Sequence, residues 1–201
     1  MNPIASTPLR IFALAALLAA SLASHAQTSP SDFSGEPDKS MAAAHESFVK
    51  GDMKKAGNDI DKASAYVKKQ AGQVTKSARS GVTKAGAELD KLGKSVKAGT
   101  VKSDDELKKT FAKVDHALAN AWHQTAAQSQ KTGKDMSAAL KKAGAALDGA
   151  AKWSGNTLQE GAQASVDGIK KAGKSVQTSA EQVGKWFQGI GDGIHDLGQK
   201  L

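Results

Sequence analysis

The feature that most constrains this chain is the absence of proline from Met41 to Leu201, in a sequence rich in alanine, lysine, glutamine and leucine. Proline breaks helices and these other residues favour them, so the composition predicts helices along the whole stretch. Runs of alternating β-branched residues, which would indicate strands, are missing, and aromatic residues make up only 4% of the chain. The sequence therefore predicts an all-α fold with a shallow, alanine-rich core.

Apolar residues recur along this stretch with a period of 29 residues. The tetrapeptide KKAG stands at 54–57, 141–144 and 170–173, with the near copy TKAG at 83–86. Two apolar columns follow the same period: Met53, Val82, Phe111, Leu140 and Ile169, and Ile60, Leu89, Leu118, Leu147 and Val176. Within one copy the apolar positions step by four and three, which places them on one helix face. The pattern predicts an antiparallel helical bundle of about five helices built on a 29-residue amphipathic repeat.

Glycine and polar clusters predict where the helices begin and end. Ser103 and Glu106 form a capping box that opens a helix. Three further turns are expected at Gly51-Asp52, Thr132-Gly133 and Ser154-Gly155-Asn156. The expected helices of the bundle, residues 41–187, cover 41–50, 53–98, 103–131, 134–153 and 157–187, and a glycine-rich amphipathic tail, 188–201, follows them.

Residues 1–26 have the features of a secretory signal peptide. Arg10 is followed by an apolar run from Ile11 to Ala20 and by small residues up to Ala26, where we expect cleavage. We therefore expect a periplasmic or secreted protein, and residues 27–40, with two prolines, predict a disordered linker. No later segment approaches the roughly 20 apolar residues of a membrane span, so no transmembrane span is expected in the mature chain.

The charge of the mature chain is positive and carried almost entirely by lysine. Removal of residues 1–26 leaves 27 basic and 20 acidic residues, a net charge of +7, and Arg79 is the one arginine among them. Arginine is favoured for bidentate recognition of phosphates and bases, so no specific nucleic-acid partner is expected. The chain has no cysteine, which excludes disulfides and thiol chemistry.

The lysines of the KKAG copies are candidate contacts for an anionic surface: Lys54, Lys55, Lys141, Lys142, Lys170 and Lys171. They form either a solvated face beside a small residue that lets another helix approach, or a ladder that binds anionic lipid or acidic protein by diffuse electrostatics. A similar choice applies to the apolar stripe of the tail, which comprises Trp186, Phe187, Ile190, Ile194 and Leu197. This stripe either caps the bundle core or lies in a membrane interface.

No set of residues suggests catalysis or a bound group. His116 and His123 share a helix face, but two turns, about 10 Å, separate them, which is too far to chelate one ion. His195 lies between two aspartates without a nucleophile or an oxyanion donor. We therefore expect no enzymatic activity, no catalytic residues, no cofactor and no metal.

Two segments carry a family resemblance. Residues 41–69 predict a helix, a Gly-Asp turn and a second helix with small residues at A-x-x-x-I-x-x-A spacing, and residues 116–151 repeat this arrangement around Gly133-Lys134. Both resemble the helical hairpins of the YfdX-type family of small periplasmic bacterial proteins, and more loosely tetratricopeptide hairpins. The resemblance implies an exported, all-helical, non-enzymatic protein linked to envelope stress, with no catalytic residues to carry over.

Two functions fit these observations. The first is a periplasmic binding or chaperone-like module, linked to the cell envelope, that meets other exported proteins. The alternative is an amphipathic, envelope-associated protein that gains helix on anionic lipid through its lysine faces and its tail. Each glycine inside a predicted helix costs about 0.5–1 kcal/mol relative to alanine, so the helices need either close mutual packing or a partner surface. Neither hypothesis fixes the oligomeric state.

Overall fold

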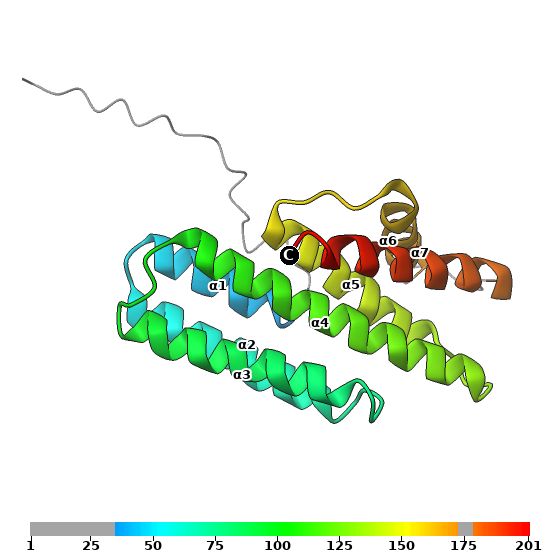
Figure 1. Ribbon diagram of the computed structural model, residues 1–201, viewed down its shortest axis with the longest axis horizontal. Helices are drawn as coiled ribbons and strands as arrows, with labels where there is room; N and C mark the ends of the chain where they lie inside the picture. Colours follow the sequence, from blue (N-terminus) through cyan, green and yellow to red (C-terminus); the bar gives the residue numbers. More distant parts are fainter. Residues whose placement is uncertain (1–34, 173–178) are drawn as a thin grey trace, which may run out of the picture.

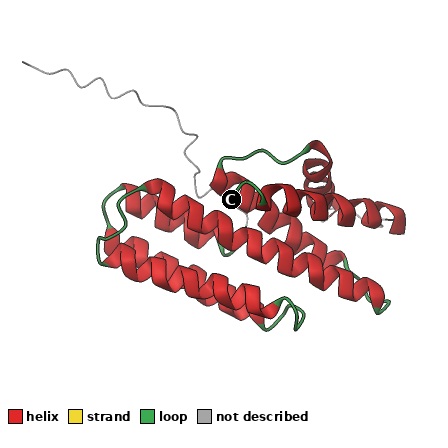
Figure 2. Ribbon diagram, in the orientation of Figure 1, coloured by secondary structure: helices red, strands yellow, loops and turns green. Residues whose placement is uncertain are grey.

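The computed structural model describes residues 35–172 and 179–201. These residues form seven helices: α1 (Asp38–Val49), α2 (Met53–Ala71), α3 (Arg79–Lys97), α4 (Asp104–Lys131), α5 (Ser137–Ser154), α6 (Glu160–Ala172) and α7 (Ala180–Gly198). Figure 2 shows helices and no strand in these two ranges, which confirms the all-α prediction. The predicted signal peptide and residues 27–34 of the predicted linker lie outside the described residues.

The longest helix, α4, is the central element of the bundle. It contacts α1, α3, α5 and α7, while α2 lies against α1 and α3. Figure 1 shows the α2–α3 hairpin along one side of α4 and α7 along another. The last two helices contact each other, and both also contact α5. Helices α1, α3, α5 and α7 therefore surround α4, while α6 lies against α5 and α7 and does not belong to this inner group (Figure 1).

The expected single helix over 53–98 is wrong, because the chain reverses between Ala71 and Arg79. The two resulting helices, α2 and α3, pack side by side as a hairpin. A straight helix of this length would extend about 70 Å and leave much of its apolar face uncovered. The hairpin instead buries Ile60 and Leu89 completely. Since the 29-residue spacing continues through the reversal, the apolar pattern alone did not reveal it.

The expected division between a last helix, 157–187, and a separate tail, 188–201, is also wrong. Residues 160–172 form α6, and the second half of α7 contains most of the predicted tail. The glycines of α7 are compensated by packing: a Cβ on Gly193 would lie 2.6 Å from the Cβ of Ala162, and one on Gly189 would lie 2.8 Å from the backbone oxygen of Gly161. These glycines let α7 approach α6 closely.

The local signals for helix ends were more accurate. Ser103 precedes α4, and its side chain accepts a hydrogen bond from the backbone N–H of Glu106, as the capping box predicts. Gly51, Gly133 and Gly155 all have positive φ, so the three expected turns are confirmed. The predicted start at Met41 is wrong by three residues, since α1 begins at Asp38, directly after Pro37.

The core contains the described members of both apolar columns except Met53, which is half-buried: Ile60, Val82, Leu89, Phe111, Leu118, Leu140, Leu147 and Ile169. The helices nevertheless range from 12 to 28 residues in length and do not each correspond to one 29-residue unit. The columns thus identify which side chains are buried, whereas the turns set the number of helices.

Candidate functional site

Trp153, in the last turn of α5, joins three helices at one end of the bundle. Its side chain is only 2% exposed, and its indole Nε1 donates a hydrogen bond to Asp38 Oδ1 of α1 at 3.1 Å. The ring centroid lies 5.0 Å from that of Phe111 in α4 and 5.9 Å from that of His45 in α1, both in edge-on geometry. Packing and a polar contact therefore fasten α1 to α4 and α5 at this point.

A buried pair of carboxyl groups lies beside this tryptophan. Asp115 of α4 is fully buried beside Asp38, and neither of its carboxyl oxygens has a hydrogen-bond partner among the described residues. Both carboxyl groups crowd Gly149, because a Cβ there would lie 2.7 Å from Asp115 Oδ2 and 2.8 Å from Asp38 Oδ1. Burial, followed by the neighbouring Asp38, raises the pKa of Asp115 well above its usual value, and burial also raises the pKa of Asp38. The pair is therefore expected to hold a shared proton.

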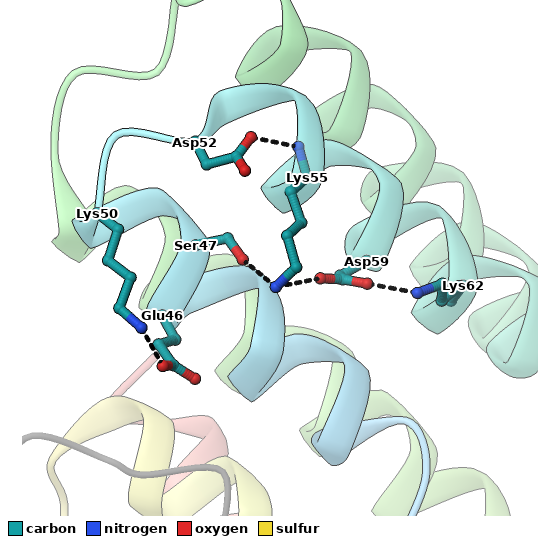
Figure 3. A network of polar contacts seen from close by, with 7 residues as sticks. All are labelled: Glu46, Ser47, Lys50, Asp52, Lys55, Asp59 and Lys62. Atoms are coloured by element: carbon teal, nitrogen blue, oxygen red, sulfur yellow. Dashed lines mark hydrogen bonds and ion pairs between the residues drawn. The ribbon is translucent and has the colours of Figure 1, made fainter.

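The buried Asp59 of α2 shows by contrast what this pair lacks. Figure 3 shows Asp59 between two lysines, with Lys62 Nζ at 2.6 Å and Lys55 Nζ at 3.9 Å. In the described part of the chain no ion pair reaches Asp115, and no N–H or O–H group other than the carboxyl of Asp38 is placed to donate to it. Lysines therefore balance the charge of Asp59, whereas burial without a neighbouring cation favours the protonated form of Asp115.

The polar cluster continues from Trp153 toward the surface. His45, which is buried, has its Nε2 atom 2.5 Å from Asp104 Oδ1 at the start of α4. The second carboxylate oxygen of Asp104 forms an ion pair with Lys108 Nζ at 2.6 Å. This chain of contacts leads from the interior to a lysine that lines a pocket.

The pocket has a volume of about 670 Å³ and lies between the start of α4, the end of α5 and the residues after α7. The described residues that line it are Asp105, Lys108, Lys109, Lys152, Trp153, Ser154, Gly155, Asn156, Lys200 and Leu201. Four lysines and one aspartate thus surround this space, and Leu201 also lines it. Two other cavities, of about 80 and 370 Å³, are each lined by a single lysine, so this pocket offers more cations and more space than they do.

One lysine of each KKAG copy makes a contact to a neighbouring helix. Lys55 donates to Ser47 Oγ of α1 at 3.1 Å, and Lys170 pairs with Asp148 Oδ2 of α5 at 2.9 Å. Lys142 lies 3.9 Å from the Trp122 ring centroid and donates to Gln73 Oε1 at 2.9 Å, and partial burial lowers its pKa. The other three lysines, Lys54, Lys141 and Lys171, are exposed. The structure does not bring the six lysines together as one surface site, since they lie on α2, α5 and α6.

The alanine and glycine of KKAG are buried in the two copies whose four residues are all described. A Cβ on Gly57 would lie 2.3 Å from the Lys97 side chain of α3, and one on Gly144 would lie 3.5 Å from both Ile169 and Ile190. The tetrapeptide therefore combines an exposed lysine pair with a close helix contact.

The apolar stripe of α7 faces the bundle. Ile190, Ile194 and Leu197 are buried, while Trp186 and Phe187 are half-buried and pack against the core. Two histidines of α4, which sequence reasoning set aside as metal ligands, fasten this helix. His116 Nε2 donates to the backbone oxygen of Ile194 at 2.8 Å, and His123 Nε2 donates to that of Phe187 at 3.0 Å.

The side chains around His123 further define this contact. The imidazole stacks on Phe187, with centroids 4.2 Å apart, and would contact a Cβ on Gly191 at 3.1 Å. Burial lowers the pKa of His123, although the Phe187 carbonyl and Asp192 act in the opposite direction. The glycines of α7 therefore provide space for imidazoles as well as for α6.

Sequence reasoning missed the carboxyl pair and the pocket. One signal for the pair was present: Asp115 lies four residues after Phe111 and three before Leu118, so it occupies the apolar face of α4. A charged residue at such a position requires a partner. Its partner, Asp38, lies in a segment predicted to be disordered, and the pocket combines residues more than 40 positions apart, so no local pattern indicated either.

These features define an all-helical protein with a polar cluster and a basic pocket at one end. Comparisons with protein-family models, with curated proteins and with solved structures find no match to this chain. The YfdX-type resemblance therefore stays a prediction. None of the described helices has the length and apolar character needed to cross a bilayer. Among the same residues no group of three or more histidine, aspartate or glutamate side chains is placed to hold a metal ion.

Proposed function

We propose that the mature chain is an exported, non-enzymatic helical-bundle protein that acts as a periplasmic binding or chaperone-like module of the cell envelope. The observation that carries this proposal is that the helices cover one another's apolar faces. In residues 35–172 and 179–201, Val49 is the one large hydrophobic side chain that is highly exposed, at 53%. A bundle of this kind can fold without a surface or a partner and can present a preformed site.

The alternative function, folding onto anionic lipid, has less support. It requires α7 to turn its apolar stripe outward, yet Ile190, Ile194 and Leu197 are buried in the bundle. It also requires free lysines, and Lys55, Lys142 and Lys170 each contact a neighbouring helix. The remaining exposed lysines would give only a diffuse, salt-sensitive attraction to other envelope components.

The 29-residue repeat fits this proposal as a unit of helix packing. The copies at 54–57, 83–86 and 141–144 each bury an Ala-Gly step, while both lysines of the first and third of these copies are exposed. We infer that the spacing keeps successive apolar faces in the same register, so that hairpins of different length share one core.

Circular dichroism of the mature chain, with and without anionic vesicles and at two salt concentrations, tests this function. We expect a helical spectrum in buffer alone, a cooperative thermal transition and no gain of helix on vesicles. A chain that is mostly coil in buffer and becomes helical on vesicles would contradict the proposal and favour the alternative.

A further inference from the structure

The positive charge of the folded chain is concentrated on one hairpin. Residues 52–98, which comprise α2, α3, the turn between them and the capping Asp52, contain eleven basic and five acidic residues, a formal net charge of +6. The other described residues, 35–51, 99–172 and 179–201, contain 15 basic and 14 acidic residues, a net charge of +1. The hairpin therefore carries six of the seven excess positive charges of the described chain.

These positive charges face the solvent, and the acids of the hairpin compensate only some of them. All eleven basic side chains are exposed, whereas Asp59 is buried and Asp90 is half-buried. Four lysines form ion pairs with acids of the hairpin. Six further lysines form no ion pair in the described part of the chain: Lys54, Lys69, Lys76, Lys84, Lys91 and Lys94. Exposed charges without partners produce a positive potential in front of the hairpin.

The two helices of the hairpin form one continuous outer face. Lys68 of α2 pairs with Asp90 of α3, and Asp61 of α2 pairs with Lys97 of α3, so two ion pairs cross the seam between the helices. On its inner side α2 lies against α1 and α3 lies against α4, so the exposed lysines lie on the side away from the bundle (Figure 1). Each helix has 19 residues and is about 28 Å long, so the lysines are spread over a broad face.

We propose that this outer face docks the folded bundle on the surface of an anionic lipid bilayer. The inference rests on the proposed function, because it requires a bundle that is already folded. The KKAG copies of α5 and α6 are not part of the docking face, since they lie in the part of the chain that has almost no excess charge. The apolar stripe of α7 is not part of it either, because Ile190, Ile194 and Leu197 stay buried.

A bilayer surface fits this face better than a compact partner does. The basic residues of the hairpin are spread along two helices, and none of them lines any of the three cavities described above. Arg79 is the one arginine among them, so bidentate recognition of single phosphates is not the basis of binding. A plane of anionic headgroups instead lets many lysines act at once, and each lysine near the surface strengthens binding about fivefold.

The docking is electrostatic and does not insert the chain into the bilayer. Among residues 35–172 and 179–201, Val49 is the one large hydrophobic side chain that is highly exposed, and it lies outside the hairpin. Attraction between exposed charges is screened over a Debye length. Binding should therefore be reversed completely by salt and should leave the bundle unchanged.

Co-flotation of residues 27–201 with vesicles tests the proposal. The vesicles consist of phosphatidylcholine with about one-third phosphatidylglycerol, and vesicles of phosphatidylcholine alone serve as the control. At about 0.1 M salt, where the Debye length is about 10 Å, we expect binding to the anionic vesicles only; at about 1 M salt, where it is about 3 Å, we expect release. Circular dichroism should show no gain of helix, and the tryptophan emission should not shift, since the hairpin contains no tryptophan.

A triple variant locates the docking face. Lys84→Gln, Lys91→Gln and Lys94→Gln together remove three exposed lysines of α3 that have no ion pair. At about fivefold for each lysine close to the surface, the triple variant should bind the anionic vesicles about tenfold to a hundredfold more weakly. Glutamine favours helix about as well as lysine does, so the bundle should stay folded, and thermal unfolding in buffer checks this.

A second triple variant is the matched control. Lys113→Gln, Lys141→Gln and Lys171→Gln remove three exposed lysines without ion pairs from α4, α5 and α6. The net charge falls by the same amount as in the hairpin variant, but the docking face is untouched. Vesicle binding should therefore change by less than about twofold.

The possible failures are distinguishable. If both triple variants weaken binding equally, or if the anionic vesicles are not bound at about 0.1 M salt, the docking face is wrong while the binding module stands. Soluble polyglutamate is a further arm: if it binds and the vesicles do not, the partner is an acidic protein and the lipid surface is wrong. A chain that is coil in buffer and gains helix on vesicles would overturn both the docking face and the proposed function.

Discussion

Two helices are fastened to α4 by buried polar groups, and the two contacts have opposite chemistry. At the α1 seam, which comprises Asp38, Asp115 and Trp153, two carboxyl groups meet, and no lysine of residues 35–172 or 179–201 pairs with Asp115. At the α7 seam, which comprises His116, His123 and the carbonyls of Phe187 and Ile194, two imidazoles donate to the backbone. Burial favours the protonated, neutral form of the carboxyl groups at the first seam, and it favours the neutral form of His123 at the second.

This difference gives the two seams opposite dependence on pH. Asp38 and Asp115 have raised pKa values in the folded state, so their contribution to stability is present at low pH and is lost as the pH rises from the usual aspartate value through the raised pKa. His123 has a lowered pKa, so its contribution is present above the ordinary value of 6.5 and is lost as the pH falls below it. The α7 seam therefore contributes less stability as the pH falls below 6.5, and the α1 seam contributes less as the pH rises above the usual aspartate pKa.

The largest expected effect comes from breaking the α1 seam at its tryptophan. Trp153→Ala removes a buried indole and its hydrogen bond to Asp38, and should lower the free energy of unfolding by about 3–5 kcal/mol in urea denaturation. Trp186→Ala, at a half-buried position of α7, serves as the control and should cost less than half as much. Equal losses in the two variants would show that the α1 seam contributes no more to the free energy of unfolding than the half-buried Trp186 does.

The next effect is on the packing of α7. Gly193→Ala places a Cβ 2.6 Å from that of Ala162 and 2.8 Å from Leu147 Cδ2, so we expect a loss of about 1–3 kcal/mol. Gly184, in the same helix, has open space where a Cβ would be, and Gly184→Ala should stabilise by about 0.5–1 kcal/mol. Thermal unfolding of both variants measures this difference, and a stabilising Gly193→Ala would contradict the close approach of α7.

Replacing one carboxyl group of the pair tests whether a charge on Asp115 lowers stability at the α1 seam. Asp115→Asn keeps the shape and can donate to Asp38, so at pH 8 it should raise the free energy of unfolding by about 1 kcal/mol, and the gain should disappear toward pH 4. Asp59→Asn is the matched control: this buried aspartate pairs with Lys62, and its loss should destabilise at pH 8. If both asparagine variants lose stability at pH 8, Asp115 is not held neutral by a proton.

The smallest effect is expected at the α7 seam. His123→Gln retains an N–H donor for the Phe187 carbonyl but does not titrate, so it should remove part of the loss of stability between pH 7.5 and pH 5, about 0.5–1 kcal/mol. The exposed His195 of α7 provides the control, since His195→Gln should keep the wild-type response. If His123→Gln shows the same pH dependence as the wild type, His123 does not cause the loss of stability below about pH 7.5.

Local features of this fold could be predicted from the sequence, and long-range ones could not. The all-α class follows from composition, and the cap at Ser103 and the turns at Gly51, Gly133 and Gly155 follow from local hydrogen bonding and positive φ. The reversal between α2 and α3 was missed because the apolar spacing is the same on both sides of it. The packing of α2 against α3, which buries Ile60 of one helix and Leu89 of the other, favours the reversal.

The candidate site was missed for a related reason. The KKAG lysines were conspicuous because they repeat, whereas the pocket lysines follow no repeat and are brought together at three helix ends. Likewise, the glycines of α7 indicated a separate tail after the last helix, yet each of Gly189, Gly191 and Gly193 lies inside α7 and faces a group on another helix. Glycine identity in a sequence does not say whether the missing side chain leaves flexibility or makes room for a neighbour.

Hydrogen exchange of residues 27–201 in buffer without vesicles, at pH 5 and pH 8 and corrected for intrinsic rates, measures the pH dependence of the two seams. The account predicts that all the described helices are protected at both values, that α1 is more protected at pH 5, and that α7 is more protected at pH 8. Helices that exchange freely in buffer, or α1 and α7 protection that changes in the same direction, would contradict it.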